Sequence, residues 1–176
     1  WEFGAQYLID FKELNGEGER VASGKRLIIG LFGNGNNSFR TNTSAFVSRF
    51  NPTFNVRNDT IFFVDEMRGD GQLPAELTGG LLYEDVNRLK VGVEYSMGMW
   101  SNYRNDSQPN RRVILEDNWG VTAGVEYIPD NASYNNYFKR VRYRLGALYQ
   151  TDPRVLEEGQ LRRYGLTLGM GLPIVR

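Results

Sequence analysis

The sequence predicts an all-β protein: an antiparallel up-and-down transmembrane β-barrel with about eight strands present, as part of a larger barrel. Large apolar side chains alternate with small or polar ones along most of the chain, and a period of two is typical of extended strands. Glycine is abundant at 20 of 176 residues, and aromatic residues make up 13%. No apolar run approaches the roughly 20 residues that a membrane-spanning helix needs.

The clearest alternation lies in Tyr137–Gln150 and Tyr164–Ile174. In the first segment Tyr143, Leu145 and their apolar neighbours occupy one face, and arginines occupy the other. The second segment sets leucines and Met170 against glycines and a threonine. The connector Thr151–Gln160 contains Pro, Gly and several charges, so we expect a hairpin with a long loop.

Six further strands are predicted from the same pattern, at Trp1–Phe11, Val21–Phe32, Ser38–Phe50, Leu73–Tyr83, Leu89–Met99 and Asn118–Tyr127. Pro74 is acceptable close to the start of its strand, where a ladder donor can be lost. We expect a long loop at Asn51–Gly71, with a short extended piece at Thr60–Val64, and a polar loop at Arg104–Arg112.

Connection lengths predict the orientation of the strands. The shorter connections Gly33–Asn37, Glu84–Arg88 and Pro129–Asn136 are expected together on the periplasmic side, because membrane barrels have short periplasmic turns and longer outer loops. Aromatic residues then fall into two interfacial sets. These are Tyr83, Tyr127 and Tyr137 at the inner boundary, and Trp100, Trp119, Tyr149 and Tyr164 at the outer boundary.

Composition excludes several classes of function. Lys+Arg and Asp+Glu balance at 21 each, so no bulk charge favours nucleic acid as a partner. The sequence has no Cys and no His, which removes thiolate metal sites, a Cys nucleophile and the commonest general base. We therefore expect no enzyme, no catalytic residues, no metal and no cofactor.

Charged residues are expected on the inner face of the barrel. Arg140, Arg142 and Arg144 alternate along one predicted strand, and Glu94 and Glu126 share that face on the two preceding strands. One interpretation is a charged constriction or ligand anchor in the lumen. The other, which we favour, is a structural salt-bridge network that fills a polar interior.

Five segments between Leu73 and Ile174 carry a resemblance to a known family; they read LPAELTGGLLYED, KVGVEYSMGMWSNY, GVTAGVEYIPDN, YFKRVRYRLGALYQ and YGLTLGMGLPI. They resemble outer-membrane β-barrel proteins of the Bacteroidetes, distantly similar to the long-chain fatty-acid transporters (FadL-like). The resemblance implies a bacterial outer-membrane location and a passive channel for small hydrophobic molecules. The alternative is a non-transporting accessory or structural barrel subunit of a larger outer-membrane complex. Its expected partners are the lipid bilayer and other outer-membrane proteins.

The pattern also predicts which way side chains face and which strands lack a neighbour. Residues 1–176 are expected to form a single barrel domain that is incomplete at both ends, so that Trp1–Phe11 and Tyr164–Ile174 do not pair with each other. Val93, Val125, Leu145 and Leu166 are expected to face lipid or a partner, whereas Gly124, Arg142 and Thr167 face the lumen.

Overall fold

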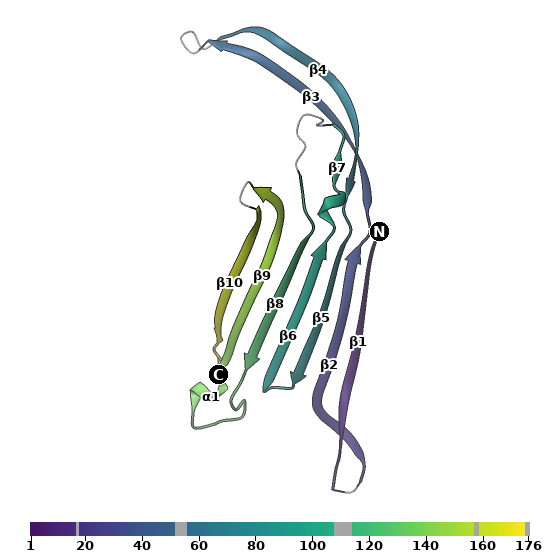
Figure 1. The fold of residues 1–176 in the computed structure, drawn as a ribbon. Coiled ribbons are helices and arrows are strands. Elements are labelled where there is room, and N and C mark those ends of the chain that lie inside the picture. The colour runs from purple at the N-terminus through teal and green to yellow at the C-terminus, as the bar shows by residue number, and fades with distance from the viewer. Residues whose placement is uncertain (17, 52–55, 108–113, 157–158, 175–176) are drawn as a thin grey trace.

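The computed structural model describes residues 1–176 apart from 17, 52–55, 108–113, 157–158 and 175–176. The described chain is antiparallel β almost throughout, as predicted (Figure 1). The strands are β1 (Glu2–Leu14), β2 (Arg20–Asn34), β3 (Asn37–Asn51), β4 (Val56–Leu73), β5 (Glu76–Asp85), β6 (Leu89–Gly98), β7 (Arg104–Asn105), β8 (Asn118–Tyr127), β9 (Arg142–Leu156) and β10 (Gly159–Gly171). Two short helices, η1 (Trp100–Asn102) and α1 (Tyr137–Arg140), lie in connections.

Seven strands form the main sheet, in the order β1-β2-β5-β6-β8-β9-β10. Every neighbouring pair is antiparallel, so the sheet is an up-and-down meander. Its longest interruption lies between β2 and β5. The register is regular across its centre, where Gly92 pairs with Gly124 and Gly124 pairs with Gly146. The period of two in the sequence therefore becomes two faces of one sheet.

The interruption is a long hairpin of β3 and β4 that projects beyond one end of the main sheet (Figure 1). The predicted loop at Asn51–Gly71 is wrong, because Val56–Leu73 is a strand paired with β3; residues 52–55 of that loop lie outside the described chain. A two-stranded ribbon has little interior, so its side chains need not alternate in polarity. The sequence of β4 therefore lacked the alternation by which the other strands were predicted. The tiny strand β7 pairs with β4 and completes a second sheet.

Several strand boundaries also differ from the prediction; β1 runs on to Leu14, for example, and β9 begins only at Arg142. Leu73 ends β4, and β5 begins only at Glu76, after Pro74. The predicted loop Thr151–Gln160 is largely strand, because β9 continues to Leu156 and β10 begins at Gly159. Pro153 lies where the register shifts between Thr151 and Val155. Proline has no N–H to donate, and the extra residue of a bulge does not need one. The predicted loop Arg104–Arg112 begins with the two-residue strand β7, and residues 108–112 of it lie outside the described chain.

The predicted grouping of the short connections is wrong for one of the three. Asn34 pairs with Glu76 and Lys25 with Asp85, so the Gly33–Asn37 connection lies at the opposite end of the sheet from Glu84–Arg88. The sequence did not show that β3 and β4 leave the main sheet. Because β2 pairs directly with β5, the Gly33–Asn37 connection lies on the side opposite to the one predicted.

The two outer strands of the main sheet, β1 and β10, do not pair with each other within the described chain, as expected. They are the first and seventh strands of an antiparallel order, so they run in the same direction (Figure 1). The described residues bury only two hydrophobic side chains, Ile128 and Val141, so no second layer covers either face. No helix among them is long and apolar enough to cross a membrane.

Candidate functional site: the two faces of the main sheet

One face of the main sheet, here called the apolar face, is built of large hydrophobic side chains. Val91, Val125 and Leu145 form one row across it, because Val125 pairs with both of the others. Val93 lies two residues further along β6 on the same face. Val93 is 45% exposed, Leu145 50% and Leu166 80%. Nothing in the described chain covers these side chains. A contiguous bare apolar surface of this extent indicates contact with lipid or another protein.

Aromatic rings cross the apolar face at the end nearest the β3–β4 hairpin. Tyr95, Trp119, Tyr149 and Tyr164 lie on successive strands, with ring centroids 6.4, 5.2 and 6.4 Å apart. Such spacings are those of stabilising aromatic pairs. Three of these residues were predicted for one boundary, and Tyr95 was overlooked because it sits inside an apolar run.

A second aromatic set lies at the other end of the same face. Tyr127 pairs with Tyr143, and Tyr83 pairs with Val91, close to the β5–β6 turn. Trp119 and Tyr127 are eight residues apart on β8, or about 26 Å at ~3.3 Å per residue. That separation is close to the roughly 25 Å apolar band of membrane barrels.

Two of the predicted interfacial aromatics lie outside the strands. Trp100 is in η1, with its ring 6.1 Å from that of Tyr103, and Tyr137 is in α1, with its ring 6.1 Å from that of Phe138. Tyr137 also donates a hydrogen bond to the carbonyl of Pro173 at 3.3 Å. A Cβ added at Gly98 would lie 2.9 Å from the Trp100 ring, and Gly98 is on the opposite face from Tyr95, so Trp100 is not part of the aromatic row of the apolar face.

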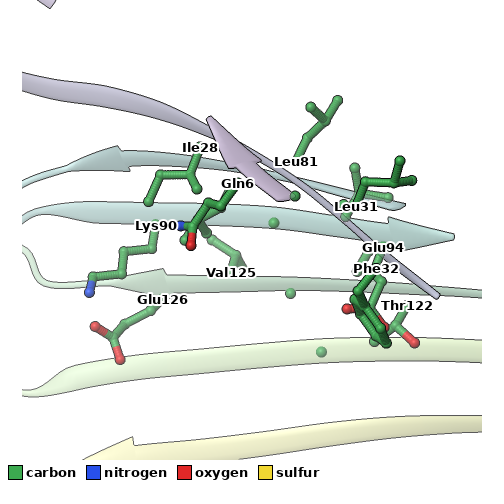
Figure 2. Close-up of a pocket in the computed structure, with 18 of the residues that line it drawn as sticks. Gln6, Ile28, Leu31, Phe32, Leu81, Lys90, Glu94, Thr122, Val125 and Glu126 are labelled. Carbon is green, nitrogen blue, oxygen red and sulfur yellow. The ribbon is translucent and has the colours of Figure 1, made fainter. Parts of the chain in front are cut away.

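The opposite face, here called the polar face, is dominated by glycine, threonine and charged residues. It lines an open trough of about 970 Å³. Glu94 and Thr122 are register partners near one end of the trough, and Lys90 and Glu126 are register partners near the other (Figure 2). Gly124 and Thr167 belong to this face, on the opposite side of the sheet from Val125 and Leu166.

A row of alternating charges crosses the polar face at the end nearest the β5–β6 turn. Its members occupy register-paired positions on six neighbouring strands: Asp10, Arg26, Glu84, Lys90, Glu126 and Arg144. We call this row the charge ladder. Glu84 lies 2.7 Å from Arg26 Nε and 2.8 Å from Lys90 Nζ, and Arg144 Nε donates to Glu126 at 2.6 Å. Opposite charges on facing positions stabilise the register of antiparallel strands.

The structure brings together only part of the predicted charge network. Arg144 and Glu126 form an ion pair, but Glu94 pairs in register with Thr122 and Gly80, away from the ladder. Arg142 lies near the β5–β6 turn on the same face. Arg140 is not on the strand at all: it lies in α1, with its guanidinium carbon 5.6 Å from the Tyr137 ring centroid.

Four ladder members, Asp10, Arg26, Glu84 and Lys90, were not predicted as a site. Glu84 and Lys90 flank the short turn at symmetric positions with opposite charges, and this is the signal that could have revealed them. Recognising Arg26 required knowing that β2 pairs with β5, which the intervening hairpin concealed.

The far end of the main sheet is tied together by polar contacts among the connections. The Ser101 N–H donates to Asp117 Oδ1 at 3.0 Å, and this hydrogen bond holds the pKa of the Asp117 carboxyl below its ordinary value. Gln160 donates to the Asp117 carbonyl at 2.9 Å, and the Thr151 hydroxyl accepts from the Trp119 N–H at 2.9 Å. These bonds fix the connection before β8 against β9 and β10.

Together the features define a class of protein. It is an all-β chain with a barrel-like antiparallel sheet, a bare apolar face between two aromatic sets, and a polar face rich in glycine and charge. This division of faces is typical of membrane barrels.

The chain belongs to the BamG family, whose model matches residues 27–176. The match begins inside β2, just after Arg26, so it includes the β3–β4 hairpin and the whole of four ladder strands, β5, β6, β8 and β9. No curated protein and no solved structure matches the chain. The resemblance to fatty-acid transporters is not supported by these findings, and the family name instead relates the chain to the Bam assembly complex of the outer membrane.

Proposed function

We propose that this protein is a non-transporting subunit of an outer-membrane protein assembly complex, embedded in the bacterial outer membrane through the apolar face. The observation that carries the proposal is the uncovered apolar wall between two aromatic sets, in a chain of the BamG family. The accessory-subunit hypothesis agrees better with the family than the passive-channel hypothesis does.

The free energy of burying hydrophobic side chains favours permanent contact between the apolar face and lipid. About ten Val, Leu, Ile and Met side chains on it are roughly half exposed or more. Fully burying one such side chain contributes about 1.5–3 kcal/mol, so covering half of each contributes on the order of 10 kcal/mol in total. That is comparable to the net stability of a whole domain. Lipid acyl chains provide such a covering at the spacing set by the aromatic residues.

The polar face supports a structural role more than a conducting one. Glu84 and Glu126 each lie within 3 Å of a basic group on the neighbouring strand. Ladder carboxylates neutralised in this way hold strands together and leave little fixed negative charge to select an ion. With no His and no Cys in the sequence, we also propose no catalytic role.

The test is isolation of the tagged full-length protein from outer membranes at its native expression level. We expect other subunits of the outer-membrane assembly complex to be recovered with it. Depletion of the protein should lower the amounts of unrelated outer-membrane barrels. Recovery of the protein alone, together with normal barrel levels after depletion and diffusion of small apolar solutes into vesicles containing it, would overturn the proposal and restore the channel hypothesis.

A further inference from the structure

A small cavity of about 70 Å³ lies on the polar face where the β5–β6 turn meets the end of β8 and the start of β9. We call it the turn pocket. Its charged lining residues are Glu84, Arg88, Lys90, Glu126 and Arg142. It adjoins the charge ladder, but its two arginines, Arg88 and Arg142, are not members of that row.

The turn pocket lies next to the two buried hydrophobic side chains of the described chain and is bordered by backbone hydrogen bonds. Ile128 lines it and is 4% exposed, and the neighbouring Val141 is fully buried. The Ile128 N–H donates to the Arg88 carbonyl at 2.8 Å, and the Val86 N–H donates to the Gly24 carbonyl at 2.9 Å. These bonds tie the turn to β2 on one side and to the end of β8 on the other, so the pocket exists before a ligand binds.

The charges of the pocket are only partly compensated. Glu84 is held by Lys90 and Arg26, and Glu126 is held by Arg144. Arg88 and Arg142 form no ion pair within the described part of the chain. Two arginines without counter-ions therefore border one preformed cavity. Arginine binds planar oxyanions through paired N–H donors, and it is enriched among the residues that dominate protein interfaces.

The lining selects the kind of anion. Lys90, Arg26 and Arg144 already balance Glu84 and Glu126, so the charge left at the pocket is that of Arg88 and Arg142. The two oxygens of one carboxylate can accept from both guanidinium groups. A water molecule occupies about 30 Å³ in the liquid, so the cavity has room for a group of about two water volumes, close to the size of a carboxylate.

We propose that the turn pocket is a docking site for an acidic side chain, Asp or Glu, of a partner subunit of the assembly complex, held between Arg88 and Arg142. This inference rests on the proposed function for the identity of the partner. The pocket's preference for a carboxylate does not depend on that function and is tested separately.

The first experiment uses the full-length tagged protein in outer membranes. The double variant R88E/R142E should recover at least tenfold less of the other complex subunits per molecule of tagged protein. Lys139→Glu is the control: it reverses one charge on an exposed residue outside the pocket, three positions before Arg142, and should recover wild-type amounts. Arg142→Lys keeps the charge and should lose less than Arg142→Gln. Equal amounts of each variant in the outer membrane show that it has folded.

The second experiment uses the purified protein in detergent micelles and needs no partner. Arginine side-chain N–H resonances are followed by NMR during titration with sodium acetate, sodium phosphate or sodium chloride at matched ionic strength. We expect saturable shifts for Arg88 and Arg142 with acetate only, and loss of the Arg88 response in R142Q.

The outcomes separate the two proposals. If the wild-type protein recovers no assembly subunits but responds to acetate, the proposed function fails and the carboxylate site stands without its partner. If R88E/R142E recovers the subunits as well as K139E does, the docking inference is overturned. Equal responses to acetate and chloride, or a preference for phosphate, overturn the carboxylate assignment.

Discussion

Replacing Glu84 by Gln should destabilise the main sheet more than any other single neutralisation on the charge ladder. Glu84 carries two ion pairs, at 2.7 Å to Arg26 and 2.8 Å to Lys90, and its side chain is 11% exposed. Gln keeps the size of the side chain but removes the charge that both basic groups share.

The magnitude follows from how far the partners are exposed. Removing one member of a fully buried pair costs about 3–5 kcal/mol, whereas an exposed pair contributes about 0.2–1 kcal/mol. Arg26 and Lys90 retain 36% and 46% exposure, so both keep part of their hydration. We therefore expect a loss of about 2 kcal/mol for Glu84→Gln. Glu126→Gln should cost about 1 kcal/mol, because it breaks one pair and its partner Arg144 is 53% exposed.

The assay is urea unfolding of the full-length protein in lipid vesicles, followed by tryptophan fluorescence. With a denaturant slope of about 2 kcal/mol/M, Glu84→Gln should lower the midpoint by about 1 M. Glu76→Gln lies on the same strand at the far end from the ladder and serves as the control, with an expected change under about 0.5 kcal/mol. The reasoning is refuted if Glu84→Gln is as mild as Glu76→Gln, or milder than Glu126→Gln.

Two further predictions concern packing and pH. Gly33→Ala should destabilise the protein by about 1–3 kcal/mol in urea unfolding, because the added Cβ would lie 2.5 Å from the Glu76 carbonyl oxygen. Gly30→Ala on the same strand is the control: its Cβ meets no atom within 4 Å, so it should be neutral or slightly stabilising. The Asp117 carboxyl should titrate by NMR below its ordinary pKa of 3.8, because it accepts from the Ser101 N–H. Since its pKa is lowered in the folded state, its contribution to stability is present above pH 3.8 and is lost as the pH falls through the folded value; an unshifted titration would show that the hydrogen bond does not form.

The two faces of the main sheet were predictable because alternation is a local property. β8 begins and ends at the predicted residues, Asn118 and Tyr127, where every second side chain is apolar. The same pattern placed Val125 and Gly124 on opposite faces, and the structure agrees. Where only one face of a strand contacts lipid or an apolar core, hydrophobic side chains must occur at every second residue.

The β3–β4 hairpin could not be predicted as a hairpin because no such constraint acts on it. Phe62 is 52% exposed and Phe63 is 60% exposed, although they point to opposite sides of β4. Because both faces of β4 are exposed, neither face needs side chains of one polarity. The Asn, Gly and Asp residues of this stretch are typical of loops. Missing this hairpin also caused the error in the side assigned to Gly33–Asn37.

The charge network was predictable only in part because it depends on strand order. Arg144 and Glu126 come from neighbouring strands that follow one another in the chain, and their pairing was expected. Arg26 and Glu84 are far apart in sequence and meet only because the hairpin between them is looped out. Arg140 was misplaced because Asn136 caps a helical turn, accepting from the Phe138 N–H at 3.0 Å, within an otherwise alternating stretch.

The central claim, that the apolar face lies against membrane lipid, is tested most directly by spin labels on the two faces. The sequence has no cysteine, so Val93→Cys and Thr122→Cys each provide a single labelling site, one on each face near the middle of the sheet. With the full-length protein in lipid nanodiscs, the label at position 93 should be relaxed more by oxygen than by a water-soluble nickel chelate, and the label at position 122 should show the opposite order. A label at position 93 that is relaxed more by the nickel chelate would contradict the account.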